Sequence, residues 1–301
     1  MAIASLFGAF RFERRKVATG VAIAFRIGGE GPPLLLLHGM PQSHVMWAKV
    51  APRLARRFTL VMPDLRGYGD SDKPPTEADH APYSFRAMAE DQVALMESLG
   101  HARFAAVGHD RGARTLHRMA LDHPDRVLRA ILLDILPTLA TYEATDMGFA
   151  MTYYHWFFLT QRAPLPERLI AGDPIFYLRH KMTGWSGDPV SETIFDPACM
   201  AEYERCYRDP AMVHAMCEDY RAGATIDLAH DRADRAAGRR LGCPVHVMWG
   251  ERNPVWRGHD MLGTWRACAD GPVTGRGLPA GHYLAEERPN ETAEEIERFL
   301  G

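Results

Sequence analysis

The sequence predicts an α/β fold in which a mostly parallel central sheet is flanked by helices and carries a helical cap. Short apolar runs bounded by turn residues alternate with longer amphipathic stretches, which is typical of strands crossed by helices. The runs lack a strict alternation of apolar and polar residues, as expected of strands that are buried on both faces. With 301 residues and 47% hydrophobic content, the chain can bury a large core.

The first predicted elements are two strands of an antiparallel hairpin, at about residues 10–16 and 20–27. Five runs rich in Val, Leu and Ile then predict the buried strands, at residues 34–37, 58–62, 104–107, 127–133 and 245–249. A helix is expected over residues 84–99, because Ser84 can cap its first turn, apolar residues recur at helical spacing and Gly100 ends it. Further helices are expected over residues 112–123 and 284–300.

Between about residues 137 and 230 the pattern changes to helical segments rich in aromatic residues and methionine. Prolines interrupt these segments, and no run there is typical of a buried parallel strand. An insertion of this size after a core strand would lie over the carboxyl ends of the strands, where open α/β sheets bind ligands. We therefore expect a core formed by residues 1–138 and 230–301 and a helical cap formed by residues 139–229.

Charge and cysteine content narrow the functional class. The net charge of -3 comes from mixed charges without a long basic run, which gives no electrostatic case for nucleic acid or an anionic membrane as partner. The five cysteines form no C-x-x-C pair, which fits reduced thiols better than disulfides or a zinc site. No secretion signal is recognised, and no apolar run approaches the ~20 residues that span a bilayer. We expect a cytoplasmic enzyme that acts on a small molecule.

Asp110 is predicted to lie where a strand turns sharply into a helix, with Gly108 and Gly112 two positions to either side. The glycines remove Cβ atoms from a crowded reversal, which leaves the central side chain exposed to the amides of the following helix. A carboxylate in the place usually taken by serine is suited to displacing a leaving group from saturated carbon, and water must then hydrolyse the resulting ester. In the alternative interpretation, Asp110 only caps the helix.

Two further segments could complete such a site. The turn around Met40 directly follows the first predicted parallel strand, so the backbone amides of Met40 and Arg111 would hold the oxyanion that forms when water attacks the Asp110 ester. His282 is the best candidate for the base, because it lies on a loop before the last helix and hydrolases with this kind of turn place their histidine last in the chain.

The acid that orients His282 is expected at an unusual place. After the strand at residues 245–249, the usual acid position holds Asn253, and an amide cannot stabilise an imidazolium as a carboxylate can. Asp134, at the end of the preceding strand, is the obvious replacement, and Glu251 is the second choice. Asp134 could otherwise be a simple loop or helix cap.

Arg111 and Arg114 lie three positions apart at the start of the helix that follows Asp110, so they can project to nearly one side. Two guanidiniums could clamp a carboxylate by bidentate hydrogen bonds next to the attacking group. We therefore expect an anionic substrate. The alternative is that Arg114 pairs with an acidic side chain and Arg111 is solvated.

With these residues in view, the chain resembles the haloacetate (fluoroacetate) dehalogenases of the α/β-hydrolase superfamily over nearly its whole length. The shared motifs are HGMPQSH at 38–44, DLRGYGDS at 64–71, HDRGAR at 109–114, YHWFF at 154–158, CEDYRA at 217–222 and GH at 281–282. Most of these occur across the superfamily. The Asp-Arg-x-x-Arg motif together with His-Trp in the cap is much more specific.

The resemblance implies three groups of site residues. The catalytic residues are Asp110 as nucleophile, His282 as base and Asp134 as its partner. The ligands of the substrate carboxylate are Arg111 and Arg114. The halide-binding residues in the cap are His155, Trp156 and Tyr220. The resemblance also implies a homodimer. One departure is Met40, which stands where an aromatic residue is common.

The implied reaction converts a haloacetate to glycolate and halide without a metal or organic cofactor. An epoxide hydrolase is the closest alternative, because it uses the same kind of Asp and His machinery with tyrosine O–H donors in its cap. Tyr220 is available for this, and the second donor could be Tyr153, Tyr154 or Tyr177. Arg111 and Arg114 argue against it, since a neutral epoxide gives buried cations no counter-charge. They also disfavour a haloalkane dehalogenase, and a non-catalytic binding protein of the same fold is a remote third alternative.

Overall fold

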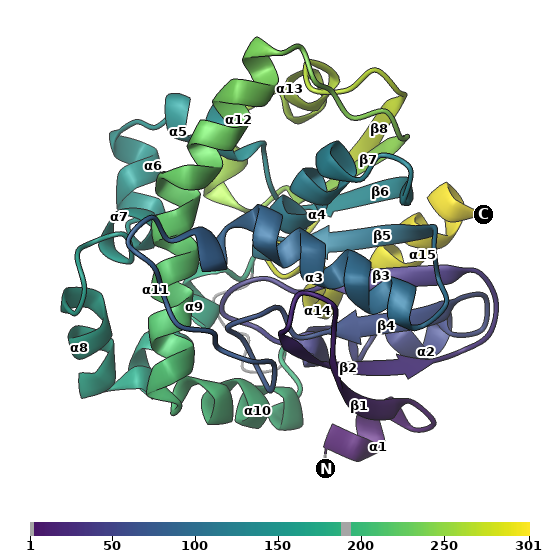
Figure 1. Ribbon diagram of the computed structural model, residues 1–301, viewed down its shortest axis with the longest axis horizontal. Helices are drawn as coiled ribbons and strands as arrows, with labels where there is room; N and C mark the ends of the chain where they lie inside the picture. Colours follow the sequence, from purple (N-terminus) through teal and green to yellow (C-terminus); the bar gives the residue numbers. More distant parts are fainter. Residues whose placement is uncertain (1–2, 188–193) are drawn as a thin grey trace.

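The computed structural model describes residues 3–187 and 194–301, and one eight-stranded sheet forms its centre (Figure 1). The strands are β1 (Arg11–Lys16), β2 (Ala22–Gly28), β3 (Pro33–Leu37), β4 (Thr59–Pro63), β5 (Phe104–His109), β6 (Val127–Leu133), β7 (Val245–Gly250) and β8 (Val273–Leu278). Their order across the sheet is β1-β2-β4-β3-β5-β6-β7-β8. β2 pairs antiparallel with β1 and β4, and the other neighbouring strands are parallel. The predicted fold class is thus confirmed.

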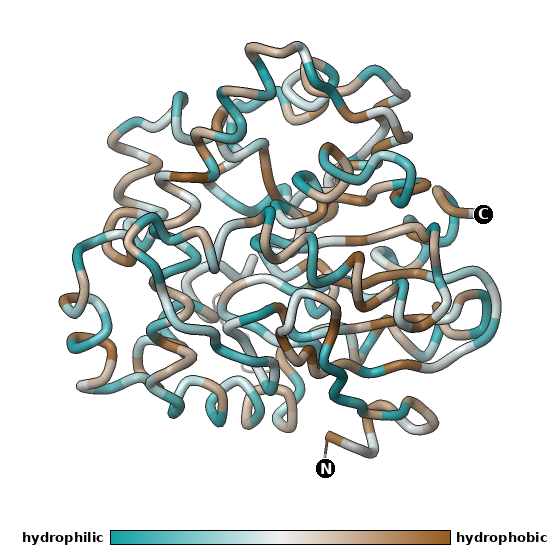
Figure 2. The backbone as a smooth tube through the Cα atoms, in the orientation of Figure 1, coloured by the Kyte–Doolittle hydropathy of each residue, from teal (hydrophilic) through white to brown (hydrophobic). Residues whose placement is uncertain are grey.

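The apolar runs form the middle of this sheet, as predicted. The four leucines of β3 are fully buried, and Figure 2 shows hydrophobic residues concentrated along the central strands. β8 was not predicted from the sequence, because only its first and last residues are buried and it contains two glycines and an arginine. Such a strand at the edge of a sheet carries no apolar run.

Helices cover both faces of the sheet. α3 (Phe85–Ser98) packs against α4 (Arg111–Asp122), which lies over β5 and β6. In Figure 1 these two helices cross in front of the strands, whereas α2 (Ala51–Leu54) and α15 (Pro289–Leu300) lie behind them. The predicted cap of α3 is present, since the Ser84 side chain accepts a hydrogen bond from the Ala87 amide.

The helix expected over residues 284–300 is in fact two helices, α14 (Leu284–Glu287) and α15. Pro289 is the first residue of α15, and it has no N–H with which to continue α14. The residue before a proline is also driven out of the helical region, and Arg288 accordingly has φ -136° and ψ 61°. The chain therefore turns at this point.

In the part of the chain that the structure describes, the segment between β6 and β7 consists of helices joined by turns and loops, with one isolated bridge between Leu241 and Ala269. Its helices are α5 (Thr138–Glu143), α6 (Met147–Thr152), α7 (His155–Phe158), α8 (Leu165–Gly172), α9 (Pro174–Trp185), α10 (Pro197–Tyr207), α11 (Pro210–Ala224) and α12 (Ile226–Ala236). Most of them gather on one side of the sheet, at the left of Figure 1. The cap boundaries at residues 139 and 229 stay a prediction, and the second falls inside α12.

Two further expectations concern the chain as a whole. All five cysteines are free thiols, as their spacing predicted. Among the described helices, none combines the length and the apolar character that a membrane crossing requires.

Candidate active site

Asp110 lies on the turn between β5 and α4, with φ 48° and ψ -115°. These angles are unusual for a residue with a side chain, so the turn is strained. Neighbouring glycines make it possible: a Cβ on Gly39 would overlap Asp110, and one on Gly108 or Gly112 would overlap nearby backbone atoms. The predicted strand–helix turn is therefore present, and it holds the Asp110 carboxylate in a buried position.

The amide of Met40 donates a hydrogen bond to Asp110 Oδ1 at 3.0 Å. This contact brings the turn after β3 to the carboxylate, as expected for an oxyanion donor; the corresponding role of the Arg111 amide stays a prediction. Burial favours the neutral acid, but the positive charges around it, first of all that of His282, lower the pKa of Asp110 below its ordinary value. Asp110 is therefore ionised at neutral pH.

His282 lies between two carboxylates. Its Nδ1 is 2.6 Å from Asp134 Oδ2, and its Nε2 is 3.9 Å from Asp110 Oδ2. Burial disfavours the imidazolium, but the hydrogen bond and the charge of Asp134 outweigh this effect and raise the pKa of His282 above its ordinary value. Glu251, the second choice for the acid, is exposed to solvent, whereas Asp134 is fully buried. The geometry thus pairs His282 with Asp134.

Asn253, which occupies the usual position of the acid, is hydrogen-bonded to Asp134. Its Nδ2 donates to Asp134 Oδ2 at 2.8 Å and to Tyr153 Oη at 3.0 Å. The amide of Gly250 donates to the other carboxylate oxygen, Oδ1, at 2.8 Å. β6 and β7 are parallel neighbours, so their carboxyl ends meet and residues from both can hold one carboxylate. This supporting role of Asn253 was not predicted from the sequence.

Arg111 is held by an acidic partner. Its Nε donates to Asp219 Oδ2 at 2.9 Å, and its Nη2 donates to the Asp219 carbonyl at 2.7 Å and forms an ion pair with Oδ1. The Tyr68 hydroxyl also donates to Asp219, at 2.6 Å. Both members of the ion pair are buried. Asp219 therefore compensates the charge of Arg111. The sequence did not predict this contact, although Asp219 belongs to the CEDYRA motif at 217–222.

Arg114 is in a different environment. Its Nη1 donates to the Leu136 carbonyl at 3.1 Å and to Thr138 Oγ1 at 3.0 Å, and its Nε is buried without a partner. The guanidinium lies over the Trp156 ring, with Cζ 4.7 Å from the centroid. No ion pair of Arg114 occurs among the described residues, so this buried cation lacks a carboxylate of its own.

The three cap residues predicted to bind halide lie beside these arginines. His155, Trp156 and Tyr220 are 2%, 1% and 1% exposed. His155 Nδ1, Trp156 Nε1 and Tyr220 Oη are all buried without a hydrogen-bond partner. Buried polar groups are nearly always hydrogen-bonded, so these three groups are available to a polar group that enters the site.

The rings of these residues are close together. The centroid of Tyr220 is 5.5 Å from that of His155 and 6.4 Å from that of Trp156, and Arg111 Cζ lies 4.3 Å from it. Burial, with the charge of Lys181, keeps the pKa of His155 well below its usual range. The ring is therefore neutral and can donate one N–H. The structure brings all the predicted site residues into one buried cluster.

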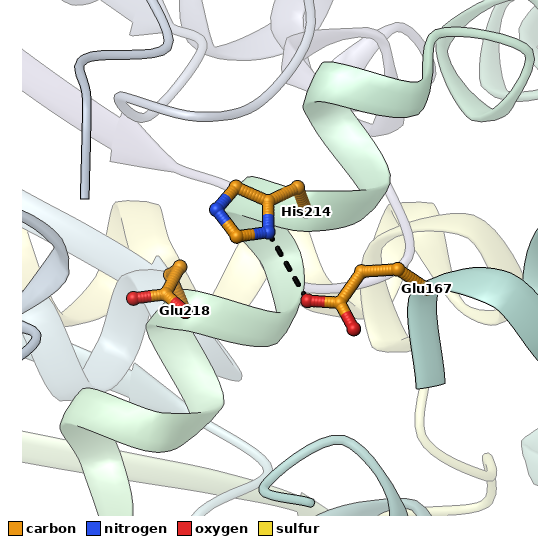
Figure 3. Close-up of side chains that lie close together, drawn as sticks. All are labelled: Glu167, His214 and Glu218. Carbon is orange, nitrogen blue, oxygen red and sulfur yellow. Dashed lines mark hydrogen bonds and ion pairs between the residues drawn. The ribbon is translucent and has the colours of Figure 1, made fainter. Parts of the chain in front are cut away.

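A second polar cluster lies between α8 and α11 and includes Glu167, His214 and Glu218 (Figure 3). His214 Nδ1 is 3.1 Å from Glu167 Oε1. Arg221 Nη1 donates to one oxygen of each carboxylate at 2.7 Å, so the guanidinium already compensates their charge. A metal ion would have to displace it, and we assign no metal to this cluster.

Comparisons with known proteins agree with this geometry. A family model for the alpha/beta hydrolase fold matches residues 32–288. A fluoroacetate dehalogenase from Burkholderia sp is 48% identical over 290 residues, which cover 96% of this chain and 94% of that protein. A soluble epoxide hydrolase from Corynebacterium sp. (strain C12) is 32% identical over 283 residues, which cover 93% and 94%.

A crystal structure of a protein from Nostoc sp PCC 7120 matches with a TM-score of 0.94 and 50% identity, and the match covers 98% of this chain and 99% of that one. These similarities extend over nearly the whole length of each protein. They therefore include the helices between β6 and β7 as well as the sheet.

Proposed function

The chain belongs to the α/β-hydrolase family, and from this premise we propose that it hydrolyses the carbon–halogen bond of a short 2-haloacid, such as fluoroacetate or another haloacetate. The environment of Arg114 is the observation that supports this proposal most strongly. Arg114 is a buried guanidinium with neutral partners only and a buried, unpaired Nε, and it follows the nucleophile by one helical turn. A substrate carboxylate would supply the missing counter-charge.

In the first step, the ionised Asp110 attacks the α-carbon of the bound haloacid. A bond forms between the carboxylate oxygen and the carbon while the carbon–halogen bond breaks, and the halide leaves with the bonding electrons. The unpaired donors of His155, Trp156 and Tyr220 would stabilise the departing ion. Each hydrogen bond to a charged group contributes about 1.5–3 kcal/mol, which matters most for fluoride because it is a poor leaving group.

In the second step, water hydrolyses the ester on Asp110. The 3.9 Å between His282 Nε2 and Asp110 Oδ2 is too long for a hydrogen bond, which leaves His282 free to take a proton from water beside the ester carbonyl. Asp134 stabilises the resulting imidazolium. The amides of Met40 and Arg111 would hold the oxyanion until the ester bond breaks. The imidazolium then returns its proton to the leaving oxygen, which gives glycolate and free Asp110.

A second candidate is an epoxide hydrolase. The Corynebacterium relative favours it, and so does Tyr177, whose hydroxyl is buried without a partner like that of Tyr220. Tyr154 is less suitable because it is partly exposed, whereas the Tyr153 hydroxyl accepts a hydrogen bond from Asn253 and keeps its own O–H free to donate. A neutral epoxide would also leave the charge of Arg114 uncompensated, so we favour the haloacid.

The two candidates are separated by measuring halide release from fluoroacetate and chloroacetate beside diol formation from an epoxide. We expect halide release by the wild-type enzyme and its loss in Asp110→Asn, which keeps the shape of the side chain but not its nucleophilicity. Epoxide turnover without halide release would overturn the proposal. The absence of both reactions would instead favour a binding protein. The cytoplasmic location and the homodimer stay predictions.

A further inference from the structure

Lys181, in α9, is a buried cation that the proposed reaction does not use. Its side chain is 2% exposed. Its Nζ lies 3.5 Å from the ring centroid of Tyr154, 5.1 Å from that of Trp185 and 5.6 Å from that of Tyr177. No carboxylate of the described residues forms an ion pair with it, although lysines are almost never fully buried unless paired. Three aromatic rings compensate only part of the lost hydration.

The ammonium group is therefore in an unfavourable environment. Burial lowers the pKa of Lys181 to about 7, because the charged form loses its hydration without gaining a counter-ion. An anion beside Nζ would supply that counter-ion and would keep the lysine protonated at neutral pH.

Trp185 connects Lys181 to the reacting centre. The centroid of its ring is 4.4 Å from that of His155 and 5.6 Å from that of His282. Lys181 Nζ lies 5.1 Å from the same ring. The cation is thus separated from a predicted halide-binding residue by one aromatic side chain.

The other two rings connect Lys181 to the protein surface. Tyr154 is 38% exposed, and Tyr154 and Tyr177 both line a surface cavity of about 230 Å³. Asp173 also lines this cavity, and its carboxylate accepts a hydrogen bond from the Phe176 amide as the cap of α9. Lys181 therefore contacts two of the side chains that line this cavity.

We propose that Lys181 forms a second anion site, which takes a small monovalent anion between this surface cavity and the cap donors. The inference rests on the proposed function, which supplies two such anions: the carboxylate of the entering haloacid and the halide that leaves. Lys181 touches neither the nucleophile nor the base. Its role is to guide an anion rather than to take part in bond making.

Anomalous diffraction from wild-type crystals soaked in bromide tests this site directly. We expect a bromide peak beside Lys181 Nζ in addition to one at His155, Trp156 and Tyr220. A peak at the cap donors with none at Lys181 would overturn the inference. Bromide at scattered surface positions only, as an adventitious ion, would overturn it too. A second soak with added acetate identifies the anion: displacement of bromide at Lys181 shows that the site also takes carboxylates, and retention shows that it prefers halide.

Kinetics of Lys181→Met and Lys181→Arg with chloroacetate give a second test. Loss of the charge in Lys181→Met is expected to raise KM about tenfold with little change in kcat, because charge steering acts on substrate capture. Lys181→Arg is expected to restore most of the difference. Equal KM values in all three proteins would contradict the inference, as would a loss of kcat and thermal stability in both variants with KM unchanged.

The bromide experiment is independent of the proposed function, whereas the kinetic test requires turnover of chloroacetate. Bromide binding needs no turnover, so bromide at Lys181 in an enzyme that releases no halide would refute the haloacid reaction but not the site. If Lys181→Met does not fold, the bromide soak of wild-type crystals still tests whether Lys181 binds an anion.

Discussion

Asp219 holds Arg111 through a hydrogen bond of 2.9 Å between Oδ2 and Nε, with both side chains buried. Arg114, three positions further along the same helix, has no such partner among the described residues. The two arginines therefore carry equal charge but unequal compensation. Arg114 is the cation that requires an anion from outside, and we expect the larger share of substrate recognition from it.

Arg114→Met should lower kcat/KM for chloroacetate by roughly 100-fold, because the substrate carboxylate loses a buried cation. Thermal stability should be nearly unchanged, since the guanidinium has only neutral partners in the free enzyme. Steady-state kinetics and a thermal melt check both. Arg118→Met is the matched control on α4: Arg118 pairs with Asp231 and Asp234, so its loss should reduce stability instead. A wild-type kcat/KM in Arg114→Met would refute the assignment.

Asp219→Asn should destabilise the fold by about 3–5 kcal/mol, because it leaves the buried guanidinium of Arg111 without a counter-charge. Urea unfolding measures the change. Asp70→Asn is the control, since Asp70 pairs with Arg205 in a largely exposed ion pair whose loss should cost less than about 1 kcal/mol. Equal effects of the two substitutions would show that the Arg111 pair is not buried in solution.

The pH dependence of kcat should report His282. The ring must be neutral to accept a proton from water, so kcat should rise with pH through a pKa above the ordinary value for histidine. Asp134→Asn removes the main cause of this increase, so the rise should move to lower pH. Its maximal kcat should also fall roughly 1,000-fold, because an amide does not stabilise the imidazolium. An unchanged profile in the variant would assign the acid role to another residue.

The same pair should also affect stability. His282 has a higher pKa in the folded protein than in the unfolded chain, so protonation favours the folded state. This contribution is present below the unfolded pKa and is lost as the pH rises through the folded one. Melting temperatures measured across this range should therefore fall more in the wild-type protein than in Asp134→Asn. Parallel curves for the two proteins would argue against the coupling.

A single turnover in ¹⁸O-labelled water should give glycolate without label at the new hydroxyl. In the two-step route that oxygen comes from Asp110, and solvent oxygen enters the enzyme carboxylate instead. Mass spectrometry of the product, with enzyme in excess over substrate, makes the measurement. Label in the first-turnover product would show that water attacks the α-carbon directly.

The sequence pointed to Asp110 and Asp134 because each follows an apolar run, whereas His282 was predicted from its late place in the chain. Asp110 and Asp134 follow apolar runs that become β5 and β6, and the carboxyl ends of adjacent parallel strands meet. Asn253 illustrates the limit of this argument: its type excluded it as the acid, but its hydrogen bond to Asp134 follows only from the pairing of β6 with β7.

Contacts with the helices between β6 and β7 could not be predicted in the same way. Asp219 lies 108 positions after Arg111, on α11. The local sequence does not show which face of this helix is turned toward Arg111. In the sequence, Lys181 likewise resembles any lysine of a helix. Only the structure shows that the rings of Tyr154, Tyr177 and Trp185 surround it. Long-range packing supplies this information, and local sequence does not.

The place of Asp134 has a consequence for engineering this scaffold. Because the acid follows β6 rather than β7, it stands four positions before Thr138, where α5 begins. The intervening Leu136 and Thr138 itself also accept hydrogen bonds from Arg114. If helices from a relative are grafted into this chain to change its substrate range, residues 134–138 must therefore stay unchanged. Under the proposed function the graft junction belongs to the active site, so the helices between β6 and β7 cannot be exchanged there as an independent module.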